Sequence, residues 1–154
     1  MNKGKTILLT GGLGFIGSHT AVELISEGFE VVIVDNLSNT RIEVLSAIES
    51  VSGIRPTFVQ GDLRDKETVQ KLFKEYKFDG CIHFAAYKAV NESVEHPLMY
   101  YKNNVGSLVV LLELIEKYNV ANFVFSSSCT VYGEPENPIV TEETASQIAA
   151  SPYG

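Results

Sequence analysis

Residues 6–35, TILLTGGLGFIGSHTAVELISEGFEVVIVD, decide the fold that we expect for this chain. Both ends of the stretch are short, β-branched and apolar, which is typical of strands buried on both faces. Between them lie a glycine-rich turn and a helical pattern, and Gly28 stands where the C-terminal glycine of a helix belongs. The order strand, glycine turn, helix, strand predicts the first unit of a dinucleotide-binding fold.

The rest of the chain continues this alternation. Further apolar strands are predicted over residues 56–60, 80–84 and 122–126, and the apolar spacing predicts intervening helices. These helices span residues 42–51, the segment after an Asp65 cap, and residues 97–119. Residues 85–96 and 134–152 are expected to be loops, and Pro152 fits a helix start. The prediction is an α/β fold with a doubly wound, mostly parallel Rossmann-type sheet, in one NAD-binding domain over residues 1–154.

Composition narrows the function classes. The 154 residues carry 12 Lys+Arg against 19 Asp+Glu, a net charge of −7, which disfavours a nucleic-acid surface. No apolar run is long enough to span a membrane, and no export signal is visible. Cys81 and Cys129 form neither a disulfide framework nor a metal-ligand spacing, and His19, His83 and His96 lie far apart. We therefore expect free thiols, a cytoplasmic location and no metal.

The glycine turn is the first candidate site. Gly11 permits a tight turn, Gly14 lets a pyrophosphate approach the backbone, and Gly17 allows close packing of the helix on the sheet. The helix N-terminus adds unpaired N–H groups and a positive dipole for the phosphates. The alternative is an ordinary glycine-rich turn between a strand and a helix.

Acidic residues follow the next two strands. Asp35 ends the second strand, 18 positions after Gly17, close to where a carboxylate binds the adenosine ribose. A carboxylate there repels a 2′-phosphate, so NAD is favoured over NADP, although Arg41 is a weak argument for NADP. A solvated strand end is the alternative for Asp35. Asp62 fits either a contact with the adenine or an ordinary loop position.

The carboxyl ends of the last two strands carry further polar groups, and ligands of open α/β sheets bind at these ends. Lys88 follows the fourth strand and is suited to a phosphate or a ribose. Ser126, Ser127 and Ser128 follow the fifth strand, where capping or a turn is the alternative role. Tyr153 could serve as a base if a cation one helical turn later favoured its phenolate, and an ordinary surface tyrosine is the alternative.

Together these motifs resemble the extended short-chain dehydrogenase/reductase family, and within it the enzymes that epimerise UDP-hexoses at C4. The residues that carry the resemblance are TGGLGFIGSH (10–19), DNL (35–37), GD (61–62), HFAAYKAVNES (83–93), NNV (103–105), FSSSCTVYG (125–133) and SPYG (151–154). The resemblance implies an NAD-dependent isomerase that interconverts UDP-glucose and UDP-galactose by oxidation at C4 to a 4-keto sugar and reduction from the opposite face. It also implies a homodimer at full length, in which the helix over residues 97–119 would pair with its twin. A helix that faces the core is the alternative explanation of the same apolar spacing.

The same resemblance implies roles for individual residues. Tyr153 would be the acid/base and Ser128 would bind the reacting hydroxyl, so both would contact the UDP-sugar, together with Lys88. The implied cofactor-binding residues are Gly11, Gly14, Phe15, Ile16, Gly17, Asp35, Asn36, Asn39, Asp62, Leu63, Phe84, Ala85, Lys88, Asn103 and Ser126.

Two departures from the family pattern qualify this expectation. Cys129 stands where the family has alanine, and the lysine expected at position 157 lies beyond Gly154. The family's C-terminal nucleotide-sugar portion is also not in this sequence, so we expect this chain to bind NAD but to be inactive alone. The alternatives are an epimerase of a related UDP-sugar and a non-catalytic NAD(H)-binding module. A 4,6-dehydratase is disfavoured, because Ser128, Cys129 and Thr130 replace the Thr-Asp-Glu segment of that group.

Overall fold

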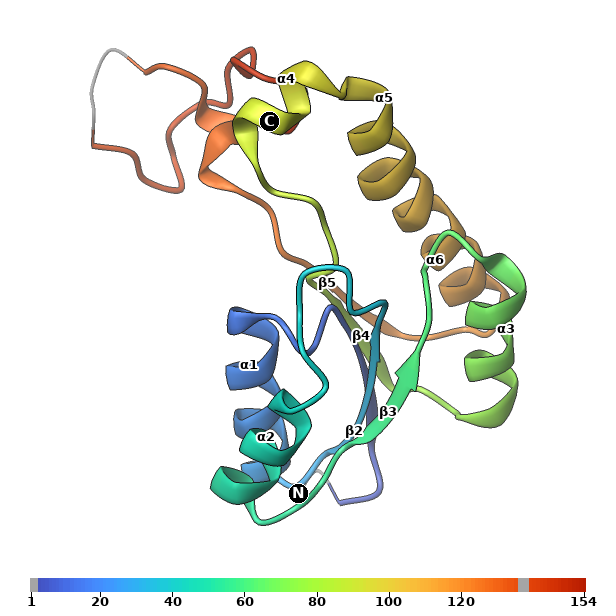
Figure 1. The fold of residues 1–154 in the computed structure, drawn as a ribbon. Coiled ribbons are helices and arrows are strands. Elements are labelled where there is room, and N and C mark those ends of the chain that lie inside the picture. Colours follow the sequence, from blue (N-terminus) through green and yellow to red (C-terminus); the bar gives the residue numbers. More distant parts are fainter. Residues whose placement is uncertain (1–2, 136–138) are drawn as a thin grey trace.

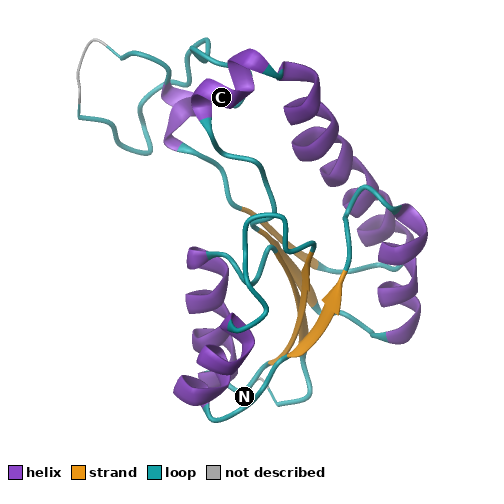
Figure 2. Cartoon of the chain, in the orientation of Figure 1, coloured by secondary structure: helices purple, strands orange, loops and turns teal. Residues whose placement is uncertain are grey.

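Strand β1 (Thr6–Thr10) is the central strand of a five-stranded parallel sheet with the order β3-β2-β1-β4-β5. The computed structural model describes residues 3–135 and 139–154 (Figures 1 and 2). The other strands are β2 (Glu30–Asp35), β3 (Thr57–Gln60), β4 (Gly80–His83) and β5 (Asn122–Phe125). The predicted doubly wound parallel sheet is confirmed. Its strand order reverses between β1 and β4, which is where such sheets bind ligands.

Helices cover both faces of the sheet (Figure 1). Helices α1 (Phe15–Ser26) and α2 (Val44–Ser52) pack on one face, where Leu9 and Ile33 are fully buried. Helices α3 (Lys66–Glu75) and α6 (Gly106–Lys117) pack on the other face around Leu8. Successive residues of β1 thus point into two different cores, which explains why its sequence is continuously apolar.

Local sequence signals act as predicted at three helix ends. Gly28 has a φ of +86° and its N–H donates to the carbonyl of Ile25, just after the end of α1. The Asp65 carboxylate accepts from the N–H groups of Glu67 and Thr68 at 3.1 and 3.3 Å, which caps α3. Pro97 lies in the first turn of α5 (Pro97–Tyr100).

The region between β4 and β5 differs from the sequence prediction in two ways. The predicted loop over residues 85–96 contains a short helix, α4 (Val90–Glu95), which has no side-chain cap and too few residues to show a period. The predicted helix over residues 97–119 is α5, a π-helical turn η1 (Tyr101–Val105) and then α6. A π-turn inserts a residue without ending the helix, so the apolar spacing alone does not reveal it.

The C-terminal part of the described chain is mostly irregular. After β5 a short 3₁₀ helix, η2 (Cys129–Tyr132), begins at Ser128. No helix begins at Pro152 within residues 139–154, contrary to the prediction, and a helical turn there would need N–H groups beyond Gly154. The predicted loop over residues 134–152 is irregular wherever it is described, and residues 136–138 lie outside the described part.

Candidate functional site

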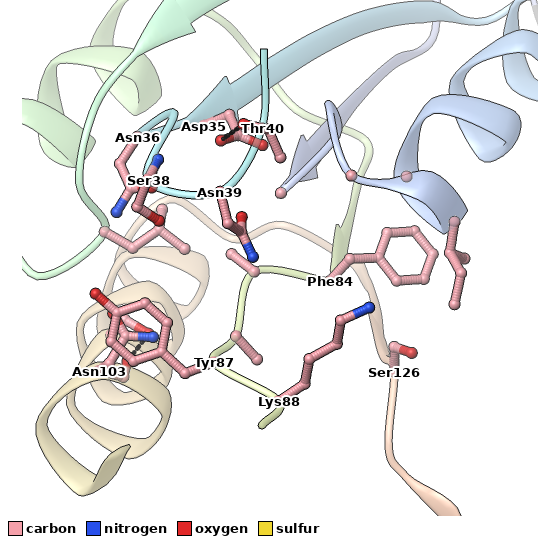
Figure 3. A pocket seen from close by; sticks show the side chains of 18 of the residues that line it. Asp35, Asn36, Ser38, Asn39, Thr40, Phe84, Tyr87, Lys88, Asn103 and Ser126 are labelled. Atoms are coloured by element: carbon pink, nitrogen blue, oxygen red, sulfur yellow. Dashed lines mark hydrogen bonds between the residues drawn. The ribbon is translucent and has the colours of Figure 1, made fainter. Parts of the chain in front are cut away.

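A cleft of about 420 Å³ lies at the carboxyl ends of the strands (Figure 3). Its walls come from the turns and loops that follow all five strands. Every residue that the sequence assigned to a site lines this cleft: Gly11, Gly14, Phe15, Ile16, Gly17, Asp35, Asn36, Asn39, Asp62, Leu63, Phe84, Ala85, Lys88, Asn103, Ser126, Ser128 and Tyr153. Residues that are far apart in the sequence, from the glycine turn to Tyr153, thus converge on one site.

The glycine turn forms the floor of the cleft between β1 and α1. Gly11 has a φ of +65°, and a Cβ there would lie 2.8 Å from the backbone N and Cα of Ala85. A Cβ on Gly17 would lie 2.5 Å from the carbonyl oxygen of Gly11 and 2.7 Å from the Cα of Gly12. Gly17 therefore allows α1 to pack closely on the turn that directly follows β1. No side chain caps the first turn of α1, whose residues Phe15, Ile16 and Gly17 line the cleft.

Asp35 connects the glycine turn to the loop after β2. Its carboxylate accepts from the N–H groups of Leu13 at 3.2 Å and Leu37 at 3.0 Å, and from Thr40 Oγ1 at 2.8 Å (Figure 3). Only 6% of Asp35 is exposed, so the solvated strand end is the wrong interpretation. A carboxylate has about four lone-pair positions, which leaves capacity for a ligand hydroxyl.

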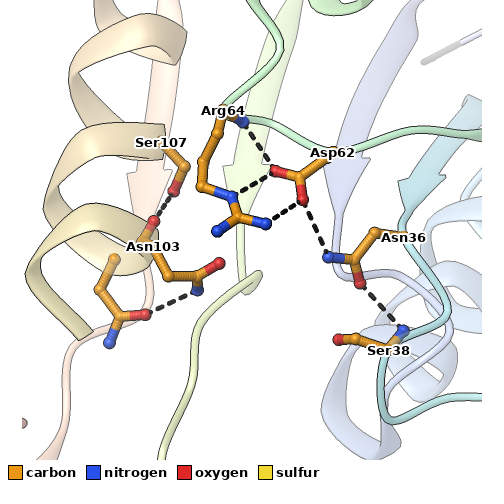
Figure 4. Close-up of polar contacts among 7 residues, drawn as sticks. Asn36, Ser38, Asp62, Arg64, Asn103 and Ser107 are labelled. Atoms are coloured by element: carbon orange, nitrogen blue, oxygen red, sulfur yellow. Dashed lines mark hydrogen bonds and ion pairs between the residues drawn. The ribbon is translucent and has the colours of Figure 1, made fainter. Parts of the chain in front are cut away.

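Asp62, after β3, is paired with Arg64 (Figure 4). The guanidinium donates to both carboxylate oxygens, at 2.9 and 2.6 Å, and the Asn36 amide lies 3.5 Å away. The hydrogen bond from Arg64 is the largest cause that lowers the pKa of Asp62 to about 2. Asp62 is therefore a charged acceptor at one end of the cleft, with its orientation set by Arg64.

The loop after β4 is held to the π-turn by Asn104. The backbone N–H of Tyr87 donates to Asn104 Oδ1 and the Asn104 amide donates to the Tyr87 carbonyl, both at 2.8 Å. Asn103 also donates to Asn104 Oδ1, and Ser107 donates to the Asn103 carbonyl (Figure 4). This network orients the backbone from which the exposed side chain of Lys88 extends into the cleft (Figure 3).

Ser128 and Tyr153 line the part of the cleft for which the resemblance implies proton transfer to and from the sugar. Ser128 Oγ accepts from the N–H of Thr130 at 3.4 Å and from its hydroxyl at 3.1 Å, so Ser128 also has the alternative capping role. The backbone N–H of Tyr153 donates to Ser93 Oγ at 3.2 Å. Both side chains are partly exposed to the same cleft.

Sequence reasoning gave no role to several residues that line the cleft, namely Ser38, Thr40, Tyr87 and Ser107. A hydroxyl five residues after Asp35 was the only available signal for Thr40, and none distinguished Ser107 from other helical serines. Within residues 3–135 and 139–154, no three His, Cys, Asp or Glu side chains group as a metal site would require. None of the helices described there combines the length and apolarity needed to cross a membrane.

Comparison with known proteins shows which proteins this chain resembles. A family model described as GDP-mannose 4,6 dehydratase matches residues 8–154. UDP-glucose 4-epimerase uge1 of Schizosaccharomyces pombe is 49% identical over 152 residues, which are 97% of this chain and 43% of the relative. The structure of UDP-glucose 4-epimerase from Bifidobacterium longum in complex with NAD+ and UDP superposes with a TM-score of 0.94 at 44% identity, covering 97% of this chain and 44% of that one.

The name of a third relative includes two hexoses. The UDP-Glc/GlcNAc 4-epimerase of Campylobacter jejuni has a TM-score of 0.91 at 37% identity, covering 98% of this chain and 45% of that structure. The chain thus spans less than half the length of each of these three relatives. The resemblance inferred from the motifs is confirmed along nearly the whole of this chain.

Proposed function

This chain belongs to the GDP-mannose 4,6 dehydratase family, and from that premise we propose that it is the NAD-binding domain of an enzyme that interconverts UDP-glucose and UDP-galactose. The proposal makes residues 1–154 the cofactor-binding part of a longer protein. One observation carries it: Ser128 and Tyr153 line the same cleft as the glycine turn and Asp35. The proposed proton-transfer group and the proposed dinucleotide cradle therefore share one cleft.

The residues present fit NAD. The glycine turn has no room for Cβ atoms at Gly11 and Gly17, and the amides of α1 begin at its edge, as a pyrophosphate requires. The buried carboxylate of Asp35 suits ribose hydroxyls and repels a 2′-phosphate. Asp62 would accept from the adenine amino group. Phe84, Ala85, Lys88 and Asn103 would line the nicotinamide half.

The residues of this chain would handle the proton of the reaction. Tyr153 would remove the proton from O4 of the hexose and return it after reduction from the opposite face. Ser128 would donate a hydrogen bond to the same oxygen, and Lys88 would bind polar groups from across the cleft. NAD, when bound, would accept the hydride from C4 and return it. A tyrosine is a poor base at neutral pH, so the proposal includes a cation four residues after Tyr153.

Calorimetric titration with NAD and NADP tests the cofactor assignment on this chain directly. We expect saturable NAD binding and much weaker NADP binding, and equal affinities would refute the role of Asp35. A coupled assay that follows UDP-glucose formation from UDP-galactose tests the reaction. The full-length protein should turn over and the 154-residue chain should not. Comparable turnover by both would refute the need for a C-terminal portion.

Two alternatives remain as competing proposals. An epimerase of a related UDP-sugar is favoured if the full-length protein prefers an N-acetylated UDP-hexose, a substrate named for the Campylobacter jejuni relative. A non-catalytic NAD(H)-binding module is favoured if the full-length protein binds NAD without turnover of any UDP-hexose. A 4,6-dehydratase is disfavoured, because η2 after Ser128 begins with Cys129 and Thr130 and has no carboxylate.

We also propose that the full-length protein is a cytoplasmic homodimer that binds no nucleic acid. Apolar side chains on α5, η1 and α6 are 40–71% exposed and follow each other at steps of three and four, as in a helical packing stripe. This exposed stripe consists of Leu98, Tyr101, Val105, Val109 and Leu112. The net charge of −7 disfavours nucleic-acid binding. The two free thiols support a cytoplasmic location.

A further inference from the structure

The backbone of Tyr153 is anchored to helix α4 by Ser93. Ser93 is fully buried, and its hydroxyl donates to the carbonyl of Val90 at 2.6 Å while it accepts from the N–H of Tyr153 at 3.2 Å. Sixty residues separate the two partners. The donor bond to Val90 fixes the rotation of the hydroxyl, so that a lone pair points toward Tyr153.

Tyr100 supports the same arrangement from the side. It is 1% exposed, and its hydroxyl donates to Glu92 Oε2 at 2.7 Å and accepts from the N–H of Ala89 at 3.0 Å. Its ring meets that of Tyr153 edge to face, with 6.4 Å between the centroids. Helix α4 and the adjoining helix therefore contact both the main chain and the ring of Tyr153.

Helix α4 also adjoins the cleft through the chain itself. It begins at Val90, two residues after Lys88, whose side chain lines the cleft with Tyr153. A displacement of the Tyr153 backbone relative to α4 would therefore change its distance to the groups that surround the substrate. Displacements of about 1 Å at a reacting group can cost a hundredfold in rate.

We propose that Ser93 is a positioning residue for Tyr153, which it holds in place through the backbone of the segment that carries the acid/base. The inference deepens the proposed function and rests on it for the role of Tyr153. Ser93 itself contacts neither substrate nor cofactor in this arrangement, since it is buried behind Tyr153 and outside the cleft lining.

The substitution Ser93→Ala removes the acceptor with almost no change in volume. Ser26→Ala is a matched control, because Ser26 donates to the carbonyl three residues earlier at 2.8 Å, lies on an exposed helix face and has no distant partner in the structure described. Both variants are made in the full-length protein. Amide hydrogen exchange of Tyr153, kcat, KM and the Kd for NAD are measured in each.

We expect the Tyr153 amide to exchange about tenfold faster in Ser93→Ala, the factor for the loss of one hydrogen bond. We expect kcat to fall by about tenfold to a hundredfold, with KM and the Kd for NAD unchanged. Ser26→Ala should change none of these quantities. This split between kcat and KM separates positioning from a general loss of structure.

Three outcomes would overturn the inference. They are unchanged exchange at Tyr153, faster exchange with unchanged kcat, or a lower kcat accompanied by a higher KM and weaker NAD binding. Absence of epimerase activity in the unsubstituted full-length protein would instead refute the proposed function. In that case the exchange measurement still decides whether Ser93 holds Tyr153, because it does not depend on turnover.

Discussion

The Nδ1 atom of His83 lies 2.7 Å from the hydroxyl oxygen of Thr10, at the carboxyl ends of the adjacent strands β4 and β1. Both residues are buried, and the imidazole stacks on Phe125 with 5.9 Å between the ring centroids. The Thr10 hydroxyl also accepts from the N–H of Ala85 at 3.4 Å, and with a neutral imidazole it donates to Nδ1 or accepts from it, according to the tautomer. A neutral His83 thus stabilises the edge of the sheet beneath the cleft.

This pair predicts an acid-sensitive fold. Burial lowers the pKa of His83 from 6.5 to about 4, so the unfolded chain binds this proton more readily than the folded chain. The free energy of unfolding should therefore fall as the pH drops from about 6.5 to about 4, by up to about 3 kcal/mol in total from this residue. Urea denaturation at several pH values measures this loss. His83→Asn should flatten the dependence in that window, and an unchanged slope would contradict the assignment.

Gly17 predicts a steric requirement at the glycine turn. Gly17→Ala places a methyl group 2.5 Å from the carbonyl oxygen of Gly11, so we expect a destabilisation of about 1–3 kcal/mol and weakened NAD binding. Gly106→Ala is the control, because its Cβ would meet no atom closer than 3.9 Å within a helix. That control should be neutral or more stable by up to about 1 kcal/mol. Chemical denaturation and calorimetry distinguish the two, and equal effects would argue against a special role for the turn.

Asp35 predicts cofactor selectivity. Asp35→Asn removes the charge that repels a 2′-phosphate and weakens the acceptor for ribose hydroxyls, so NAD affinity should fall by about tenfold to a hundredfold. The preference for NAD over NADP should shrink at the same time. Competition calorimetry with both dinucleotides provides the measurement. Retention of the full preference would place the selectivity elsewhere.

The proposed acid/base role of Tyr153 predicts that removal of its hydroxyl slows the reaction. In the full-length protein, Tyr153→Phe should lower kcat by about 10²–10⁴-fold, the usual contribution of general acid–base catalysis, and leave NAD binding intact. Ser128→Ala should lower kcat less, because it removes one hydrogen bond and no proton carrier. Steady-state kinetics with UDP-galactose gives both values. A Tyr153→Phe enzyme with normal kcat would exclude Tyr153 as the acid/base.

The exposed stripe predicts the oligomeric state. Val105→Lys inserts a charge into the middle of this stripe, where Val105 is 52% exposed, and should convert a dimer into monomers. Val51→Lys is the matched control, since Val51 is an exposed valine of α2 outside the stripe. Sedimentation velocity on the full-length protein distinguishes the outcomes. A dimer that survives Val105→Lys but not Val51→Lys would move the interface to another face.

The sequence was most informative where one local signal determined one local structure. The apolar strands, the glycine turn and the Asp65 cap depend on residues next to one another, and all three were predicted. The carboxyl ends of parallel strands meet at one edge, so the motifs after the strands could also be expected to converge. The common cleft of Asp35, Asp62 and Lys88 follows from that topology, whereas Tyr153 lies far beyond the end of β5.

Features that depend on distant contacts could not be predicted. Helix α4 has six residues and no capping side chain, and its position depends on Tyr100 and on Ser93 contacting Tyr153. The π-turn occurs where the side chain of Asn104 holds the backbone of Tyr87, seventeen residues away in the chain. No periodicity within either segment encodes these partners.

The shared carboxylate of Asp35 has a thermodynamic consequence for any ligand of the cleft. Because Leu13, Leu37 and Thr40 all donate to this carboxylate, contacts within the protein itself order the two loops. Little conformational entropy then remains to be lost at that end of the cleft. Truncated nucleotides that reach only Asp35 should therefore retain a disproportionate share of the binding free energy of the whole dinucleotide, which makes adenosine a natural competitor.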